Sequence, residues 1–268
     1  MVTHQDIQKN EKNAISLGQL RVLKNTPSAE KELAVSYRHL QKKFGRNVVL
    51  NDLNLALKPG RTIAVLGPNG SGKTTLIKSL LGMVLPDSGE IMVDGKPVKD
   101  NWKYRQQIDY LPQIANFPAN LRVKELINMI KDLRGSTSKD TELIKFLKIG
   151  SYLDSKLGTL SGGTKQKVNL VLTFMFDSPL VILDEPTSGL DPISLIRLKE
   201  LIQREKTRGK TILITSHIMN FVEEVSDELV FLLEGKIYFQ GSISELKSST
   251  GEEDLETAIA NILLNNNA

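Results

Sequence analysis

The sequence predicts an α/β protein with a mainly parallel sheet. Three short runs, "RTIAVLG", "PLVILDEP" and "KTILITSH", are rich in Ile, Leu and Val, as expected for parallel strands that are buried on both faces. Longer stretches elsewhere have apolar residues at helical spacing. A chain of 268 residues is long enough for one large domain of this class or two small ones.

Composition excludes several kinds of chemistry. The chain has no cysteine, which rules out disulfides and thiolate chemistry, and it has only three histidines. No apolar run approaches the roughly 18 residues of a membrane span, and the first residues lack a signal-peptide core. We therefore expect a cytoplasmic protein that reaches a membrane only through a partner. The net charge of +4 is scattered among acids, which predicts no nucleic-acid partner.

Local patterns predict the elements of the N-terminal half. Residues 1–30 are polar and aperiodic, which indicates an N-terminal extension. The mixed alternation of "LAVSYRHLQKKF" predicts an edge strand, and "RTIAVLG" predicts a buried strand that feeds a turn. "TTLIKSLLGM" has the apolar spacing of a helix. "GEIMVDGKPV" predicts a hairpin that turns at Asp94 and Gly95.

The C-terminal half is read in the same way. From about residue 120 to 176 the pattern is mostly helical. "DPISLIRLKELIQREKTRG" predicts a helix capped by Asp191, with Pro192 first and Gly209 as the C-cap. "ELVFLLEGKIYFQG" predicts a hairpin that turns at Glu234 and Gly235, and "DLETAIANILL" predicts a tail helix. We expect ligands where "IAVL", "VILD" and "ILITS" end, because open α/β sheets bind beyond the carboxyl ends of their strands.

A complete phosphate loop follows the first buried strand. "GPNGSGKT" fits G-x-x-x-x-G-K-[ST] between a strand and a helix. Its glycines let backbone N–H groups close around phosphate oxygens. Lys73 would reach the β- and γ-phosphates, and the Thr74 hydroxyl would bind Mg²⁺. The predicted nucleotide-binding residues of this loop are Gly67, Pro68, Asn69, Gly70, Ser71, Gly72, Lys73, Thr74 and Thr75.

Further polar residues follow other strands of the predicted sheet. Asp184 ends the strand in "LVILDEP" and suits a direct or water-mediated hold on Mg²⁺. Glu185 would point the opposite way on a strand, and Pro186 turns the chain there. A carboxylate just past the metal ligand is well placed to polarise an attacking water. His217 ends "ILITSH" on the same edge, and Gln113 lies in "YLPQ" after another short strand.

"LSGGTKQK" contains a second glycine pair. Ser161 has the position of an N-cap, with Gly162 and Gly163 in the first helical turn. Each glycine weakens a helix by roughly 1 kcal/mol relative to alanine. An ordinary capped helix would explain the pattern. The alternative is that another group must approach the backbone closely at a position without side chains, and a helix N-terminus favours a phosphate.

Together these motifs resemble those of the ATP-binding subunits of ABC transporters. "GPNGSGKTT", "YLPQ", "LSGGTKQK", "LVILDEP", "SGLD" and "TSH" occur in that order. The resemblance implies an α/β P-loop NTPase core with a mainly parallel sheet, an antiparallel β subdomain and a helical signature subdomain. It also implies that two such subunits dock head to tail around ATP and Mg²⁺. Ser161, Gly162 and Gly163 of one subunit would then contact the γ-phosphate of its partner's ATP.

The resemblance assigns roles to single residues. Glu185 is then the catalytic glutamate, His217 the switch histidine, and Gln113 a contact to Mg²⁺, to the attacking water and to the coupling surface. Thr74 and Asp184 are the other metal ligands implied. Asp191 matches the D-loop aspartate, and a simple helix cap before Pro192 is the alternative. Phe44 matches the aromatic that stacks on adenine, with Tyr37 as the weaker alternative. Thr164 departs from the commonest glutamine, as exporter-type members often do.

The resemblance also implies a domain arrangement and a sub-type. Residues 31–248 would form the ATPase domain, with the helical subdomain at about 114–176 and a helical tail at 249–268. The tail is similar to that of bacterial exporter-type subunits and is too short for the regulatory domain of some importer subunits. More loosely, "YLPQIANFPANLRVKELI" and "FMFDSPLVILDEPTSGLDP" resemble subunits encoded with nitrous-oxide reductase maturation systems, which serve copper-site assembly.

The predicted function is that of an ATPase which drives transport. The chain would dimerise with a second copy, pair with integral membrane permease subunits, and lie on the cytoplasmic face of the inner membrane. A soluble ABC ATPase that acts as an assembly scaffold for metal cofactors is the alternative. A DNA-repair or translation protein is disfavoured, because we find no coiled-coil arm, zinc module or tandem domain.

Overall fold

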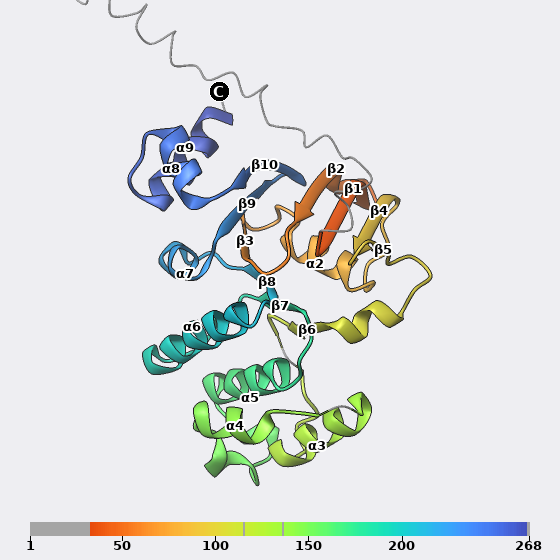
Figure 1. The fold of residues 1–268 in the computed structure, drawn as a ribbon, viewed down its shortest axis with the longest axis vertical. Helices are drawn as coiled ribbons and strands as arrows, with labels where there is room; N and C mark the ends of the chain where they lie inside the picture. Colours follow the sequence, from red (N-terminus) through yellow and green to blue (C-terminus); the bar gives the residue numbers. More distant parts are fainter. Residues whose placement is uncertain (1–32, 115, 136, 267–268) are drawn as a thin grey trace, which may run out of the picture. The chain divides into compact units, whose positions relative to one another are not determined.

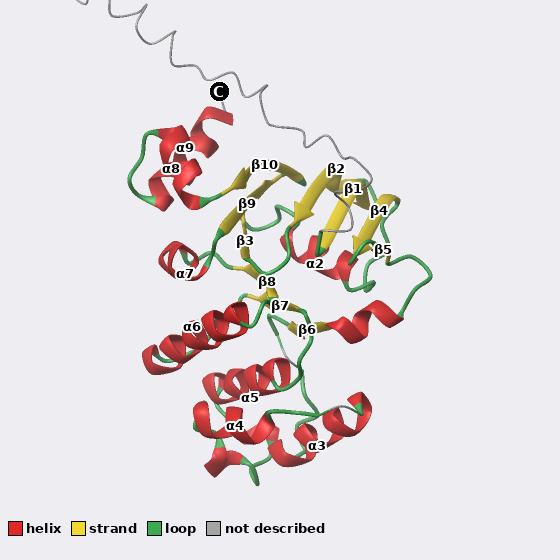
Figure 2. Cartoon of the chain, in the orientation of Figure 1, coloured by secondary structure: helices red, strands yellow, loops and turns green. Residues whose placement is uncertain are grey.

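The computed structural model describes residues 33–266, except for residues 115 and 136. The predicted N-terminal extension therefore lies outside the described residues. Figures 1 and 2 show two sheets with helices around them, which confirms the α/β class.

The smaller sheet is antiparallel and has the strand order β2-β1-β4-β5. Its strands are β1 (Val35–Phe44), β2 (Asn47–Leu57), β4 (Ser88–Val93) and β5 (Lys96–Pro97). The prediction of an edge strand at β1 was wrong, because β1 pairs with β2 on one side and with β4 on the other. Register shifts around Leu40 interrupt its alternation, so that the pattern reflects irregular pairing and not an exposed edge.

The larger sheet has the strand order β10-β9-β3-β8-β7-β6. Strands β6, β7, β8, β3 and β9 pair in parallel, and only β10 is antiparallel to its neighbour. The bounds are β3 (Thr62–Leu66), β6 (Ile108–Leu111), β7 (Leu180–Asp184), β8 (Thr211–Thr215), β9 (Glu228–Leu233) and β10 (Lys236–Gly241). Every residue of β3, β7 and β8 is buried, which confirms the three predicted core strands.

The two faces of this sheet pack into different cores. Ile63 and Val65 of β3 face a core that includes helix α2 (Lys73–Leu80) and the antiparallel sheet. Ala64 and Leu66 face a second core formed with the later helices. Burial on both faces explains why these strands are apolar at consecutive positions.

The segment between β6 and β7 is helical, as predicted (Figure 1). It contains α3 (Val123–Arg134), α4 (Asp140–Phe146), two 3₁₀ turns (Gly150–Tyr152 and Leu157–Thr159) and α5 (Gly162–Phe174). A third 3₁₀ turn, η3 (Lys103–Gln107), precedes β6. After β7 come α6 (Pro192–Thr207), α7 (Met219–Val225), α8 (Ile243–Thr250) and α9 (Leu255–Asn266). Short α7 and α8 were not predicted.

Both predicted hairpin turns are present. Asp94 and Gly95 have φ of 49° and 67°, and Glu234 and Gly235 have φ of 48° and 73°. Two consecutive residues with positive φ match the twist of the strands that they join. At the end of α6 the C-cap is Arg208, and Gly209, the predicted C-cap, is the next residue, with φ of 85°. A left-handed glycine just past the cap is the usual way to end a helix.

Tyr37 lies in the core beneath the antiparallel sheet. Its side chain is 1% exposed, and its hydroxyl has no hydrogen-bond partner in the described part of the chain. Burial raises the pKa of Tyr37 well above its usual range. Tyr104 is also buried, but its hydroxyl donates to the Leu80 carbonyl at 2.7 Å. The two tyrosines form a matched pair for a stability measurement.

We expect Tyr37→Phe to leave the free energy of unfolding unchanged or to raise it, because the substitution removes a buried polar group that is not paired. Tyr104→Phe should lower that free energy by about 1 kcal/mol, because it breaks a buried hydrogen bond. Urea denaturation of both variants tests this. An equal loss of stability in both would contradict it.

Candidate nucleotide-binding site

The loop between β3 and α2 depends on glycine at three positions. Gly67, Gly70 and Gly72 have φ of 155°, 82° and 109°. A Cβ on Gly67 would lie 2.0 Å from the Leu232 carbonyl oxygen, and one on Gly72 would lie 2.8 Å from that of Val49. The loop is therefore pressed against β9 and β2, and only glycine allows that approach.

Lys73 begins α2 and bends back over the loop. Its Nζ donates to the carbonyl oxygens of Gly67 at 2.7 Å and Pro68 at 3.0 Å. Partial burial lowers the pKa of Lys73, while the carboxylates of Glu185 and Asp184 oppose that shift. The ammonium group is thus held at the mouth of the loop, where an anion would meet it.

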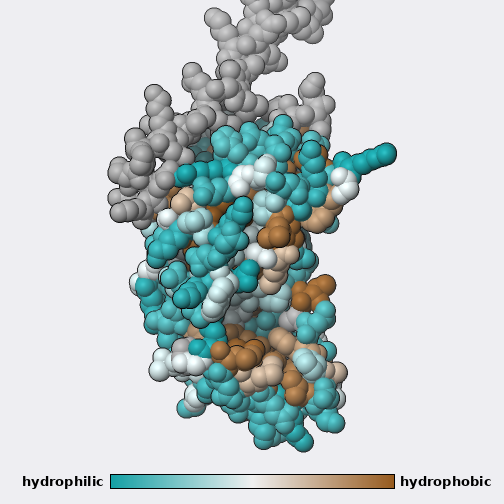
Figure 3. Space-filling view, turned by 90° about the vertical axis from the view of Figure 1, so that its right-hand side faces the viewer, coloured by the Kyte–Doolittle hydropathy of each residue, from teal (hydrophilic) through white to brown (hydrophobic). Residues whose placement is uncertain are grey.

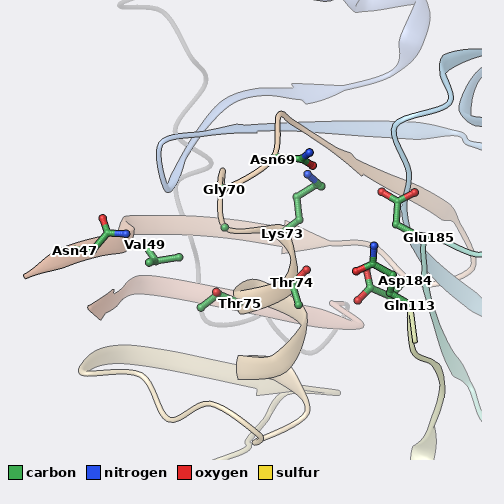
Figure 4. A pocket seen from close by; sticks show the side chains of 11 residues that line it. Asn47, Val49, Asn69, Gly70, Lys73, Thr74, Thr75, Gln113, Asp184 and Glu185 are labelled. Atoms are coloured by element: carbon green, nitrogen blue, oxygen red, sulfur yellow. The ribbon is translucent and has the colours of Figure 1, made fainter. Parts of the chain in front are cut away.

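A pocket of about 270 Å³ lies between this loop and the ends of β6 and β7 (Figure 4). Figure 4 shows Lys73 and Thr74 on one side, with Gln113, Asp184 and Glu185 opposite them. Predicted site residues that line it are Asn69, Gly70, Gly72, Lys73, Thr74, Thr75, Gln113, Asp184 and Glu185. Gly67, Pro68 and Ser71 belong to the loop but not to the lining.

The backbone at the two acidic residues, Asp184 and Glu185, differs from the prediction. Asp184 is the last residue of β7, and the chain leaves the strand at Glu185, which has φ of 50°. A left-handed conformation is uncommon for glutamate. The expected alternation along a strand was wrong at this point, because the turn begins one residue earlier than Pro186. Both carboxylates consequently lie on the same side of the pocket.

Hydrogen bonds hold the acidic pair in place. The Thr215 hydroxyl donates to Asp184 Oδ1 at 2.5 Å and accepts from the Glu185 N–H at 3.1 Å. His217 Nδ1 donates to Glu185 Oε2 at 2.9 Å. The His217 side chain is 71% exposed and that of Glu185 only 10%, so the histidine covers the glutamate from the solvent side.

The donor set suits a hard cation. Thr74, Gln113 and Asp184 line one pocket and supply a hydroxyl, an amide and a carboxylate oxygen. Mg²⁺ prefers oxygen ligands and takes few from the protein when it is bound with phosphates. Tyr110 on β6 adds a hydroxyl near Asp184, and its pKa is raised to about 12, first by burial and then by that carboxylate. The residues present therefore fit Mg²⁺.

The signature stretch (Leu160–Lys167) opens helix α5. Ser161 is the N-cap, as predicted, and its Oγ accepts from the Thr164 N–H at 3.3 Å. The hydroxyls of Ser161 and Thr164 lie 2.9 Å apart and are hydrogen bonded. Thr164 thus supports the cap directly, although a glutamine is commoner at this position in the family that the motifs resemble.

The two signature glycines have different surroundings. A Cβ on Gly163 would lie 2.5 Å from the Gly189 carbonyl oxygen, whereas a Cβ on Gly162 would meet nothing within 4 Å. Gly163 therefore allows α5 to touch the turn after β7, and Gly162 leaves backbone open to solvent. Ser161, Gly162 and Gly163 are not among the residues that line the pocket of their own chain.

Asp191 has the structural role of a helix cap. Its carboxylate accepts from the Ser194 N–H at 2.8 Å at the start of α6. Lys167 of α5 forms an ion pair with it at 2.8 Å. This ion pair first, and then the bonds from Ser194, hold the pKa of Asp191 well below its usual range. Asp191 does not line the pocket.

The predicted aromatic lies at the end of β1. Phe44 is 51% exposed and pairs across the hairpin with Asn47, which lines the pocket together with Val49. Phe44 itself is not in the lining. Tyr37, the alternative, is buried and cannot reach a ligand. Sequence reasoning missed Asn47 and Val49, and their position just after "KKFG" was the signal that could have found them.

This loop, the acidic pair and the pocket between them define a P-loop nucleotide-binding protein. The family model described as "ABC transporter" matches residues 50–188. The chain belongs to the ABC transporter family, as an ATP-binding subunit that hydrolyses ATP. In the described part of the chain, no helix is long and apolar enough to cross a bilayer.

Similar proteins include ATP-binding subunits of export systems. The Nod factor export ATP-binding protein I of Burkholderia orbicola (strain AU 1054) is 35% identical over 214 residues, which cover 78% of this chain and 70% of that protein. Its namesake in Mesorhizobium japonicum is 31% identical over 246 residues, covering 88% and 72%. A solved ATP-binding subunit of an ABC transporter has a TM-score of 0.81 and 28% identity, covering 86% of this chain and 99% of that one.

We expect Gly163→Ala to destabilise the protein by about 1–3 kcal/mol, because its methyl group would overlap a backbone oxygen that cannot easily move. Gly162→Ala is the matched control in the same helical turn, and it should not lower the stability, because alanine is the better helix former. Thermal and urea unfolding of both variants measure the difference. Equal effects would contradict the contact between α5 and Gly189.

Proposed function

We propose that two copies of the chain dock head to tail and enclose ATP between the phosphate loop of one copy and the signature stretch of the other. The observation that carries this proposal is the placement of Ser161 and Gly162. Both are exposed at the open N-terminus of α5 and contribute nothing to the pocket of their own chain. An exposed helix N-terminus attracts phosphate, and a second copy would bring one to the pocket.

Apolar residues beside the site support an interface with a second copy. Ile193 and Ile196 lie on the first turns of α6 and are 63% and 56% exposed, and Ile218 follows His217 and is 40% exposed. Transfer of an isoleucine side chain out of water lowers the free energy. A partner that covers the phosphate loop and His217 would cover these residues too.

The roles within the site follow from the geometry. Lys73 would neutralise the β- and γ-phosphates, and Thr74, Gln113 and Asp184 would hold Mg²⁺, which when bound would offset the charge on those phosphates. Glu185 would accept a proton from the attacking water. His217 would orient Glu185 through their hydrogen bond and contact the γ-phosphate.

The remaining site residues act around the nucleotide. We assign the adenine to Phe44, whose half-exposed ring lies beside Asn47, with the Lys42 ammonium 5.2 Å from the ring centroid. Asp191 would shape the turn that faces the second copy. The ATPase unit in this proposal comprises residues 31–248, with the helical subdomain at about 114–176 and the tail at 249–268. Closure on ATP and reopening after hydrolysis would then supply the motion that is coupled to transport.

An exposed apolar patch (Met83, Leu85, Trp102 and Ile114) suits the membrane subunits. These side chains are 62–76% exposed. The hydrogen bond from Tyr104 to the Leu80 carbonyl holds η3, whose N-cap is Trp102, against the end of α2. Figure 3 shows several separate groups of brown side chains on the face that it draws. Ile114 adjoins Gln113, which lines the pocket, so a permease bound at the patch would be coupled to the nucleotide site. Binding to the permease would also place the chain at the cytoplasmic face of the inner membrane.

The direction of transport is proposed from relatives. Proteins named for Nod factor export are at least 31% identical to this chain over most of its length, which supports an exporter. The looser resemblance to nitrous-oxide reductase maturation subunits stays a prediction. A soluble assembly scaffold is the competing proposal, and the exposed patch favours a membrane partner over it.

We expect Glu185→Gln to reduce ATP turnover by about 100-fold or more while ATP still binds, because an amide cannot accept the proton. The variant should then accumulate as an ATP-bound dimer. Light scattering with ATP, and with ADP as the control, measures this. A Glu185→Gln protein that stays monomeric with saturating ATP would overturn the shared site.

We expect Trp102→Asp to abolish co-purification with the membrane proteins encoded beside this chain, because a charge would disrupt an apolar contact. ATP-driven dimerisation should persist. Leu264→Asp, on α9 and also exposed, is the control and should co-purify normally. Co-purification with soluble proteins alone would instead support the scaffold.

A further inference from the structure

We propose that Thr215 is a positioning residue for ATP hydrolysis, whose single hydroxyl fixes Asp184 and Glu185 relative to each other. This inference rests on the roles proposed above for those two acids. Thr215 ends β8, two residues before His217, and the motifs assigned no role to it.

The contacts of Thr215 converge on the acidic pair. Thr215 is 0% exposed and lies opposite Asp184 in the parallel pairing of β7 and β8. Its Oγ1 donates to Asp184 Oδ1 at 2.5 Å and accepts from the Glu185 N–H at 3.1 Å. The Thr215 carbonyl oxygen accepts from the same N–H, also at 3.1 Å. One residue therefore binds the side chain of the first acid and the backbone of the second.

These contacts oppose two motions that would disorganise the site. A carboxylate at a strand end can rotate about Cβ–Cγ, and the bond to Oδ1 fixes that rotation whether or not a metal is bound. Glu185 has φ of 50°, a conformation that is unfavourable for a residue with a Cβ. Two bonds to its N–H hold the turn in that conformation. Without the hydroxyl, the turn keeps one of these two bonds, and Asp184 keeps only the Tyr110 hydroxyl as a side-chain partner among the described residues.

The chemistry needs a hydroxyl at this position. A group that both donates and accepts, and that fits a buried strand end, is a serine or threonine hydroxyl. Valine has the same shape as threonine but can make neither bond. Thr211, at the other end of β8, provides a comparison, because it is also buried and its Oγ1 accepts from the Gly60 N–H at 3.0 Å, away from the pocket.

The test compares Thr215→Val, Thr215→Ser and Thr211→Val. We expect Thr215→Val to lower kcat by about 10-fold or more and to weaken Mn²⁺ binding by about 10-fold, as loss of a residue that orients a metal ligand does. Mn²⁺ binding is measured by electron paramagnetic resonance in the presence of a non-hydrolysable ATP analogue. The affinity of Thr215→Val for a fluorescent ATP analogue, measured without metal, should equal that of the parent protein, because Lys73 and the phosphate loop are intact.

Thr215→Ser should restore both kcat and Mn²⁺ affinity, since it keeps the hydroxyl. Thr211→Val should lower the unfolding temperature but leave Mn²⁺ affinity at the parental value. If Thr215→Val folds poorly, Thr215→Ala, measured below its unfolding temperature, must show the same loss of Mn²⁺ affinity. Parental kcat and Mn²⁺ affinity in Thr215→Val or Thr215→Ala would overturn the inference.

Two further variants separate this inference from the proposed function. Asp184→Asn and Glu185→Gln should each lose turnover if the acids have the proposed roles. Full turnover in either would overturn the proposed site itself. Loss of turnover in both, with parental behaviour of Thr215→Val, would overturn only the role of Thr215.

Discussion

The turn at the end of β7 is the constraint on which the site depends. The strand stops at Asp184, and Glu185 leaves it in a left-handed conformation. A continued strand would send the two carboxylates to opposite faces of the sheet, whereas the turn brings both to one pocket. The neighbouring strand β8 holds this turn through Thr215, and His217, two residues after the end of β8, covers Glu185.

The same turn also contacts helix α5, which begins with the signature stretch. Gln166 of α5 donates to the Pro186 carbonyl at 3.0 Å, and Lys167 forms an ion pair with Asp191. Gly163 lets the helix approach the Gly189 carbonyl. The residues after β7 therefore connect the pocket of this chain to the surface that would complete a partner's pocket. A change in the position of Glu185 would therefore reach the start of α5 through the short segment from Pro186 to Asp191, which contacts that helix.

Local chemistry explains why much of the fold and of the site could be predicted. The phosphate loop, the cap at Ser161 and the two hairpin turns each depend on residues that are adjacent in the chain, and the structure contains all of them. The position of strand β1 inside its sheet could not be predicted, because β1 pairs with β4, which lies about fifty residues further along the chain. Tyr37 was an apparent candidate for the nucleotide until its burial was known.

The sequence by itself determined the family, the nucleotide chemistry and the residue types at the site, because these follow from short motifs with strict spacing. Only the tertiary structure decided which partners those residues have. Thr215 contacts Asp184 across 31 positions of the chain, and Gly163 meets Gly189 because α5 and the turn after β7 pack together. The two signature glycines are identical in the sequence, and packing alone makes one a structural contact and leaves the other open.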